Sequence, residues 1–163
     1  MSPTLKAHFA DYATFHATPG NQACHYVAVP LIVLTVVALL AQVELFTVGG
    51  FTVTLAEVVI VLVTAYYLTL DAALALLMLA GLLIGPAGLG LPAGEAARLI
   101  VWEIRLPRAI LAPLAALAVF VGAWVLQFVG HYVYEHRSPA FFRNLTHLLV
   151  GPLWVIAKAT GRA

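Results

Sequence analysis

Charged residues are scarce in this chain of 163 residues, where they make up 9% of the sequence and leave a formal net charge of +1. A soluble domain has roughly a quarter of its residues charged, so most of this surface is not expected to face water. The small net charge also gives no reason to expect nucleic acid as a partner, because such partners select clustered positive charge. The composition therefore points away from an ordinary soluble domain and favours a protein immersed in lipid.

Cysteine and serine are nearly absent as well. A single cysteine, Cys24, excludes an internal disulfide. The serines are Ser2 and Ser138, and neither lies in a G-x-S-x-G pattern, so a serine hydrolase is not expected. The zinc-protease pattern H-E-x-x-H, the H-x-x-H-H boxes of membrane desaturases, glycine-rich phosphate loops and dinucleotide fingerprints are missing too. Any chemistry must therefore come from a different set of residues.

Hydrophobic residues are abundant, at 63% of the chain, and the mean hydropathy is +1.02. A helix needs about 20 apolar residues to cross a bilayer. Four runs of this kind predict transmembrane helices at residues 26–43, 51–70, 72–91 and 109–131. Asp71 separates the second and third runs, and we expect it to cap the third helix in a tight hairpin. The predicted fold is all-α: one multi-span helical bundle in the membrane, covering residues 1–163.

Three shorter segments mix apolar and charged residues and are expected to lie in the headgroup plane, at residues 4–16, 95–108 and 141–158. In the last segment His147 shares a stripe with Arg143, which predicts a solvated face. Four spans place both termini on one side, and the positive charges after the fourth span favour the cytoplasm. The arginines at 98–108 argue against this orientation unless they lie in a surface helix. The expected location is the cytoplasmic membrane of a bacterium or the endoplasmic reticulum of a eukaryote.

Two polar stretches flank the first and fourth runs: HATPGNQACH at 16–25 and QFVGHYVYEH at 127–136. With an even number of spans, both stretches reach the same membrane face and can meet. Gln127, His131 and Glu135 are spaced four apart, and each step turns a helix by only about 40°. They therefore share one helix face, whereas His136 points elsewhere. Gly130 permits a neighbouring helix to approach closely.

The two stretches together predict a metal site. His16, His25 and His131 would supply neutral imidazoles, and Glu135 would be a carboxylate ligand or would support one. Asn21, which is expected to cap the first span, and Gln127 would form hydrogen bonds around the site. His136 and His147 are possible additional ligands. Imidazole with carboxylate suits iron or zinc, and two histidines with one carboxylate favour Fe(II). One histidine at a membrane interface is commonly a plain hydrogen-bonding group, but ionisable groups converging at membrane depth tend to be functional.

The same residues resemble the motifs of a known family, the small membrane proteins typified by the Fe(II)-dependent 2-hydroxy-fatty-acid dioxygenase of fatty-acid α-oxidation. The first motif is similar to Tyr12-x3-His16-x4-Asn21-x3-His25-x4-Pro30-Leu31. The second is similar to Trp124-x2-Gln127-Phe128-x-Gly130-His131-x3-Glu135-x3-Pro139-Ala140. The resemblance implies that the histidines bind iron, that O2 is the co-substrate, and that a 2-hydroxy fatty acid drawn from the bilayer loses one carbon. The residues that the motifs carry over are His16, His25 and His131, with Glu135 as a further candidate.

Three other readings remain open at this point. A bis-histidine haem protein would use His25 and His131 as axial ligands. A zinc-dependent membrane hydrolase would work without O2. A non-catalytic membrane scaffold would lose nothing when the histidines are replaced.

Overall fold

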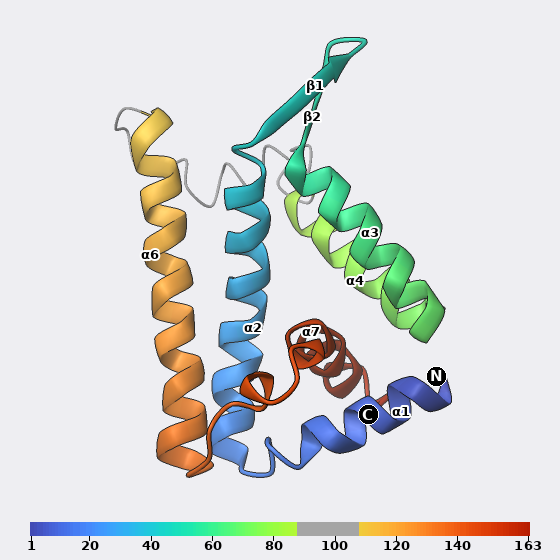
Figure 1. The fold of residues 1–163 in the computed structure, drawn as a ribbon, viewed down its shortest axis with the longest axis vertical. Coiled ribbons are helices and arrows are strands. Elements are labelled where there is room, and N and C mark those ends of the chain that lie inside the picture. Colours follow the sequence, from blue (N-terminus) through green and yellow to red (C-terminus); the bar gives the residue numbers. More distant parts are fainter. Residues whose placement is uncertain (88–107) are drawn as a thin grey trace.

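The structure is a computed structural model, and it describes residues 1–87 and 108–163. Its described part is mostly helical (Figure 1). The elements are α1 (Pro3–Ala13), α2 (Pro19–Leu40), β1 (Glu44–Val48), β2 (Phe51–Thr54), α3 (Leu55–Leu70), α4 (Ala72–Ala87), α6 (Arg108–Val129), a π-helix (Gly130–Tyr134), a short 3-10 helix (Ala140–Phe142) and α7 (Thr146–Ala159). The predicted surface segment 95–108, apart from its last residue, and the end of the predicted span 72–91 lie outside the described residues.

Two helices are long and apolar enough to cross a membrane, by length and composition alone. They are Pro19–Leu40 and the stretch Pro113–Tyr134, each of 22 residues. At about 1.5 Å per residue, such a helix exceeds the roughly 30 Å of a hydrocarbon core. The predicted spans 26–43 and 109–131 fall largely within these two helices, which run side by side in Figure 1.

Helix α2 begins earlier than the sequence suggested. Its N-cap is Thr18, with Pro19 at the first helical position, so the prediction that Asn21 caps this helix is wrong. Proline suits the first turn because its missing N–H would have no helical partner there. Asn21 therefore lies inside the first turn, where its side chain is free to face α6.

The predicted second and third spans form the antiparallel pair α3 and α4 (Figure 1). Each has 16 described residues, fewer than the 20 or so that a bilayer crossing needs, and a four-span bundle is not established. The tight hairpin between them is present. The Leu74 N–H donates to Asp71 Oδ1 at 3.0 Å, which confirms Asp71 as the cap of the third predicted helix.

The all-α prediction is wrong at residues 44–54, where β1 and β2 form an antiparallel hairpin. Strand β2 covers the first four residues of the predicted span 51–70. Gly49 and Gly50 have φ angles of 58° and 84°, the left-handed conformation that a two-residue hairpin turn requires and glycine adopts readily. The threonine, valine and phenylalanine residues that flank the turn favour extended backbone.

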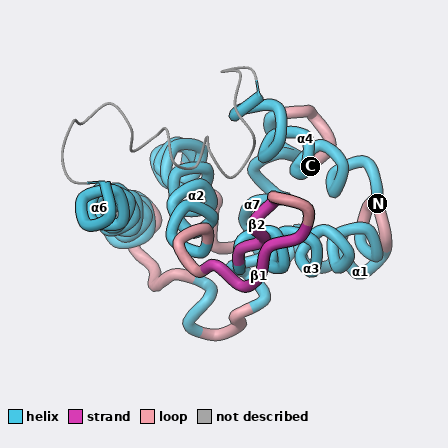
Figure 2. The backbone as a smooth tube through the Cα atoms, turned by 90° about the horizontal axis from the view of Figure 1, so that it is seen from above, coloured by secondary structure: helices cyan, strands magenta, loops and turns pink. Residues whose placement is uncertain are grey.

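One face of helix α7 packs between other helices, and the prediction that His147 lies on a solvated face is wrong. Figures 1 and 2 place it between α2 and the α3–α4 pair, with α1 beside it. Leu153 is 0% exposed, Trp154 2% and His147 4%. Trp154 and Leu153 join a core cluster with Leu5, Phe9 and Tyr12 of α1. This packing fixes the C-terminal end of α1, and with it His16, against the first turns of α2.

Candidate metal site

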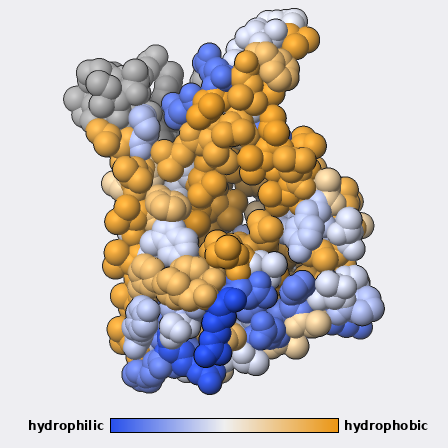
Figure 3. All heavy atoms as spheres, in the orientation of Figure 1, coloured by the Kyte–Doolittle hydropathy of each residue, from blue (hydrophilic) through white to orange (hydrophobic). Residues whose placement is uncertain are grey.

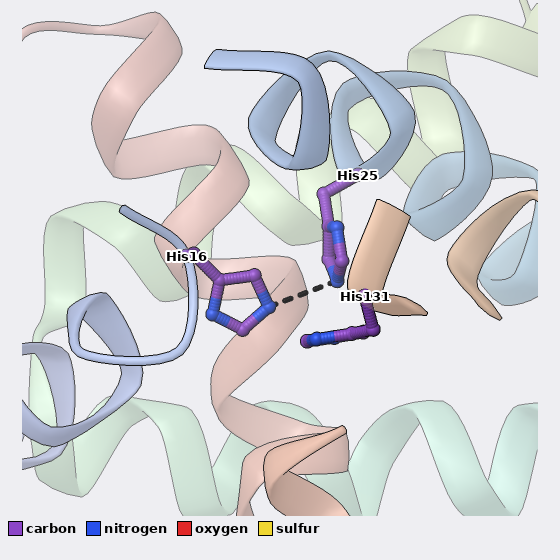
Figure 4. A group of neighbouring side chains, drawn as sticks. All are labelled: His16, His25 and His131. Atoms are coloured by element: carbon purple, nitrogen blue, oxygen red, sulfur yellow. Dashed lines mark hydrogen bonds between the residues drawn. The ribbon is translucent and has the colours of Figure 1, made fainter. Parts of the chain in front are cut away.

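Three histidines from distant parts of the chain converge at the end of the molecule that holds α1 and α7. His16 lies in the turn between α1 and α2, His25 on α2 and His131 on the π-helix that follows α6 (Figure 4). Each side chain is at most 3% exposed. Each offers one ring nitrogen, and these nitrogens lie within 4.8 Å of one another. We call these three residues the histidine cluster.

Hydrogen bonds fix the tautomers of two members of the cluster. The Nδ1 of His16 lies 2.7 Å from the Tyr12 carbonyl oxygen, and the Nδ1 of His25 lies 2.9 Å from the Asn21 carbonyl oxygen. A carbonyl only accepts, so both Nδ1 atoms carry the proton and both Nε2 atoms carry a lone pair. Neutral imidazole with a free Nε2 is the form that binds metal.

The two free nitrogens face each other. The Nε2 atoms of His16 and His25 are 2.9 Å apart, and two lone pairs at this distance repel unless a cation lies between them or beside them. Burial, followed by the charge of His25, lowers the pKa of His16 to about 3, which opposes a second proton on its ring. A metal cation fits this arrangement, so the three buried histidines could bind a metal ion.

A π-helix positions the third histidine. The Glu135 N–H donates to the Gly130 carbonyl at 3.1 Å, the wide i to i+5 bond of a π-turn. The His131 ring packs edge-to-face with both other rings, at centroid distances of 4.9 Å. Within the described residues its buried Nδ1 has no hydrogen-bond partner. Buried polar atoms are rarely left unpaired, which is a further reason to expect a ligand here.

Gly130 lets the end of α6 touch α2. A Cβ at this position would lie 2.5 Å from Asn21 Oδ1 and 3.0 Å from Cys24 Cβ, closer than atoms can approach without a shift. His25 lies one turn beyond Asn21 on α2, so this contact places His131 opposite His25.

Gly130→Ala is therefore expected to destabilise the protein by about 1–3 kcal/mol through overpacking. Thermal unfolding in lipid nanodiscs would measure the loss. Gly122→Ala, on α6, the helix that leads into Gly130, is the matched control, because an added Cβ there meets nothing within 4 Å. Equal melting temperatures for the two variants would contradict the close contact.

Glu135 ties the π-helix to the start of α2. Its Oε1 accepts from the Ala17 N–H at 2.9 Å. Its Oε2 accepts from the Thr18 N–H at 3.0 Å, the Thr18 hydroxyl at 2.8 Å and the Asn21 amide at 3.2 Å. Burial alone would raise the pKa of Glu135, but these hydrogen bonds lower it to about 2, so the group is a carboxylate at neutral pH. Its oxygens are already engaged and it lies outside the histidine cluster, which favours a role in holding the site together.

The histidine cluster opens into a cavity of about 80 Å³. Its walls include Gln127, whose buried Oε1 has no partner in the described structure, together with Trp124 and Phe141. Asn21 does not line the cavity. Its amide group donates to the Phe15 carbonyl at 2.9 Å and to Glu135, so it supports the turn that carries His16.

The remaining predicted residues fall at different places. His136 is exposed and outside the cluster, with a φ angle of 52°. His147 lines the cavity but is also outside the cluster, and its Nε2 lies 2.8 Å from Asp11 Oδ2. The sequence analysis predicted neither the His147–Asp11 contact nor the hydrogen bond between Thr18 and Glu135. For Thr18 a signal was present, because a threonine directly before a proline is typical of the start of a helix.

Comparison with known proteins gives a consistent result. Residues 2–163 match the family described as "Mpo1-like: 2-hydroxy-palmitic acid dioxygenase Mpo1-like". The chain is also 30% identical to a protein of Saccharomyces cerevisiae named "2-hydroxy-palmitic acid dioxygenase MPO1". The aligned region of 150 residues covers 90% of this chain and 73% of the yeast protein. No solved structure matches. The family match spans both polar stretches and everything between them, and the chain therefore belongs to the Mpo1-like family.

Proposed function

We propose that this protein is an Fe(II)-dependent membrane dioxygenase that shortens 2-hydroxy fatty acids by one carbon, and that His16, His25 and His131 hold the metal. The observation that carries the proposal is the pair of facing, unprotonated Nε2 atoms of His16 and His25, 2.9 Å apart, with His131 beside them. The yeast relative is named as a dioxygenase of 2-hydroxy-palmitic acid, which supplies the class of reaction.

The overall reaction balances with O2 as the only co-substrate. The bond between the carboxyl carbon and C2 breaks, the carboxyl carbon leaves as CO2, and C2 is oxidised to the carboxyl group of the shorter acid. One 2-hydroxy acid and one O2 together give the shorter acid, one CO2 and one H2O, and O2 accepts the four electrons that the two carbons lose. Bound Fe(II) would supply the redox chemistry with O2 that amino-acid side chains do not offer, whereas zinc has none.

The protein's own residues would bind and orient the head of the substrate. The hydroxyl and carboxylate of the substrate need polar partners. Gln127, in the cavity wall, offers an unpaired Oε1 that can accept a hydrogen bond from the 2-hydroxyl group. Trp124 and Phe141, packed edge-to-face at 5.2 Å, form an apolar wall of the same cavity that limits access of water.

The surface supports a membrane location with the site near the headgroups. Figure 3 shows hydrophobic side chains over the part of the face formed by α2, α3 and α6, whereas hydrophilic ones gather at the end that holds α1. Large apolar side chains such as Val61, Leu62 and Val125 are more than half exposed, which water would penalise and lipid would not. The histidine cluster lies close to the hydrophilic end, where the carboxylate of a bilayer-dissolved acid would sit. We propose, as the charge distribution suggests, that this end faces the cytoplasm.

The alternative functions have less support. The His25 and His131 rings are in edge contact with centroids 4.9 Å apart, closer than two axial ligands on opposite faces of a porphyrin, so the haem reading is not favoured. Zinc hydrolysis fits the histidine cluster but not the reaction for which the yeast relative is named.

The function is tested with protein purified without oxygen, reconstituted in nanodiscs and loaded with Fe(II). Adding air and 2-hydroxypalmitic acid is expected to yield the acid one carbon shorter, detected by mass spectrometry. Unsubstituted palmitic acid is expected to react far more slowly, because it lacks the hydroxyl donor.

Three controls separate the readings. Omitting O2 or adding an Fe(II) chelator should stop the reaction, and Zn(II) should not replace iron. Turnover that persists without O2 would indicate a hydrolase, and full iron loading without turnover of any 2-hydroxy acid would refute the proposed substrate.

A further inference from the structure

A second cavity, of about 210 Å³, lies between α2, α4 and α7. The side chains that line it are all apolar: Val29, Pro30, Val33, Leu34, Met78, Leu82, Pro152, Val155 and Ile156, with Gly81 completing the wall. On the face drawn in Figure 3 the surface between α2 and α3 is hollowed and hydrophobic. We call this cavity the apolar groove.

The apolar groove adjoins the metal cavity. Val29, Val33 and Pro152 line both, so the boundary that the two cavities share is made of apolar side chains. Along α2, the path from His25 at the histidine cluster to Leu34 in the groove rises about 13 Å. The two cavities together thus have a polar end with metal-binding groups and a long apolar continuation.

We propose that the apolar groove binds the acyl chain of the substrate while the 2-hydroxy carboxylate lies at the histidine cluster, an inference that rests on the proposed function. An amphiphile with one polar end and one unbranched hydrocarbon chain matches this pair of cavities in both chemistry and order. A bound chain would remove apolar surface from contact with the solvent and anchor the reacting carbons next to the metal-binding nitrogens.

Gly81 is the glycine in the wall of the groove and has room for a larger side chain. It is exposed, and a Cβ added to it meets nothing within 4 Å. A large side chain at this position would enter the groove beside Met78 and Leu82, which lie on the same helix. The size of residue 81 should therefore set how long a chain the protein accepts.

The first test measures binding without turnover. A 2-hydroxypalmitic acid that carries a diazirine near its methyl end is added to the protein in nanodiscs without O2 and then photolysed. We expect labels on Met78 to Leu82 or on Val155 and Ile156, and competition by unlabelled 2-hydroxypalmitic acid. Labels confined to outward-facing residues such as Val61 and Leu62, as any membrane lipid would give, would overturn the proposal.

The second test uses chain-length preference. Gly81→Phe should lower the rate with 2-hydroxypalmitic acid relative to 2-hydroxyoctanoic acid by at least about tenfold, the scale on which pocket size discriminates substrates. Gly122→Phe, an equal change at an open glycine on α6 outside the groove, should leave the ratio unchanged. An unchanged ratio in an active Gly81→Phe protein would overturn the proposal. Groove labelling in a wild-type protein without any turnover would instead support the groove and refute the proposed function.

Discussion

Alanine in place of His16, His25 or His131 is expected to remove bound iron and, with it, turnover. The affinity for metal should fall by more than about 100-fold, because losing a residue that merely orients a ligand already costs 10- to 100-fold. Each substitution leaves two buried imidazoles without the third donor, and the loss should be similar for all three. Metal analysis of protein purified without oxygen, together with the 2-hydroxypalmitic acid assay, measures both effects.

Two other histidines provide the controls. His136→Asn removes an exposed imidazole outside the cluster, and asparagine tolerates the left-handed backbone found there, so iron should be retained. His147→Gln tests the buried neighbour that pairs with Asp11. Iron loss with this variant as severe as with His131→Ala would make His147 a ligand. Full iron retention in all three cluster variants would refute the site.

Glu135→Gln is expected to weaken metal binding by about 10- to 100-fold although Glu135 lies outside the cluster. The carboxylate accepts hydrogen bonds from Ala17 and Thr18 on both oxygens. Glutamine has the same shape, but its NH2 group would oppose one of these N–H donors, so the turn next to His16 would lose its attachment to the π-helix. Iron affinity, measured by competition with a chelator, reports the effect.

Glu57→Gln is the matched control for this substitution. Glu57 also caps a helix, since its Oε2 accepts from the Thr54 N–H at 2.8 Å, but that helix is α3, at the end of the molecule near the β-hairpin. Glu57→Gln should lower the melting temperature and leave iron affinity intact. If both variants bind iron like the wild type, Glu135 does not support the site.

Much of the architecture was accessible from residue patterns alone. Long apolar runs predicted α2 and α6, and Asp71 between two such runs predicted the turn between α3 and α4. The family resemblance rested on two motifs and is confirmed by the match over residues 2–163. The parity of the predicted spans led to the expectation that His16, His25 and His131 meet. The structure brings these residues together while describing two long spans rather than four.

Other features depended on contacts that hydropathy does not encode. The strands at 44–54 follow from Gly49 and Gly50, whose turn geometry outweighs the apolar character of the segment. The burial of His147 arises because α7 packs against α1, so a stripe that resembled a solvated face is covered by Tyr12 and Phe15. The π-turn after Gly130 could not be predicted either, because the spacing argument assumes a uniform α-helical period.

The histidine cluster draws on three separate segments of the chain, and this affects how the protein folds and how fast it is degraded. His16 and His131 lie near opposite ends of the sequence, so a metal bound to both would close a very long loop, which in an unfolded chain carries a large entropic cost. Such a bond cannot form until α6 has packed against α2, and once formed it acts as a reversible staple between them. Protein that lacks the metal would then hold a population in which these helices separate more readily, and it would be degraded faster than the loaded form.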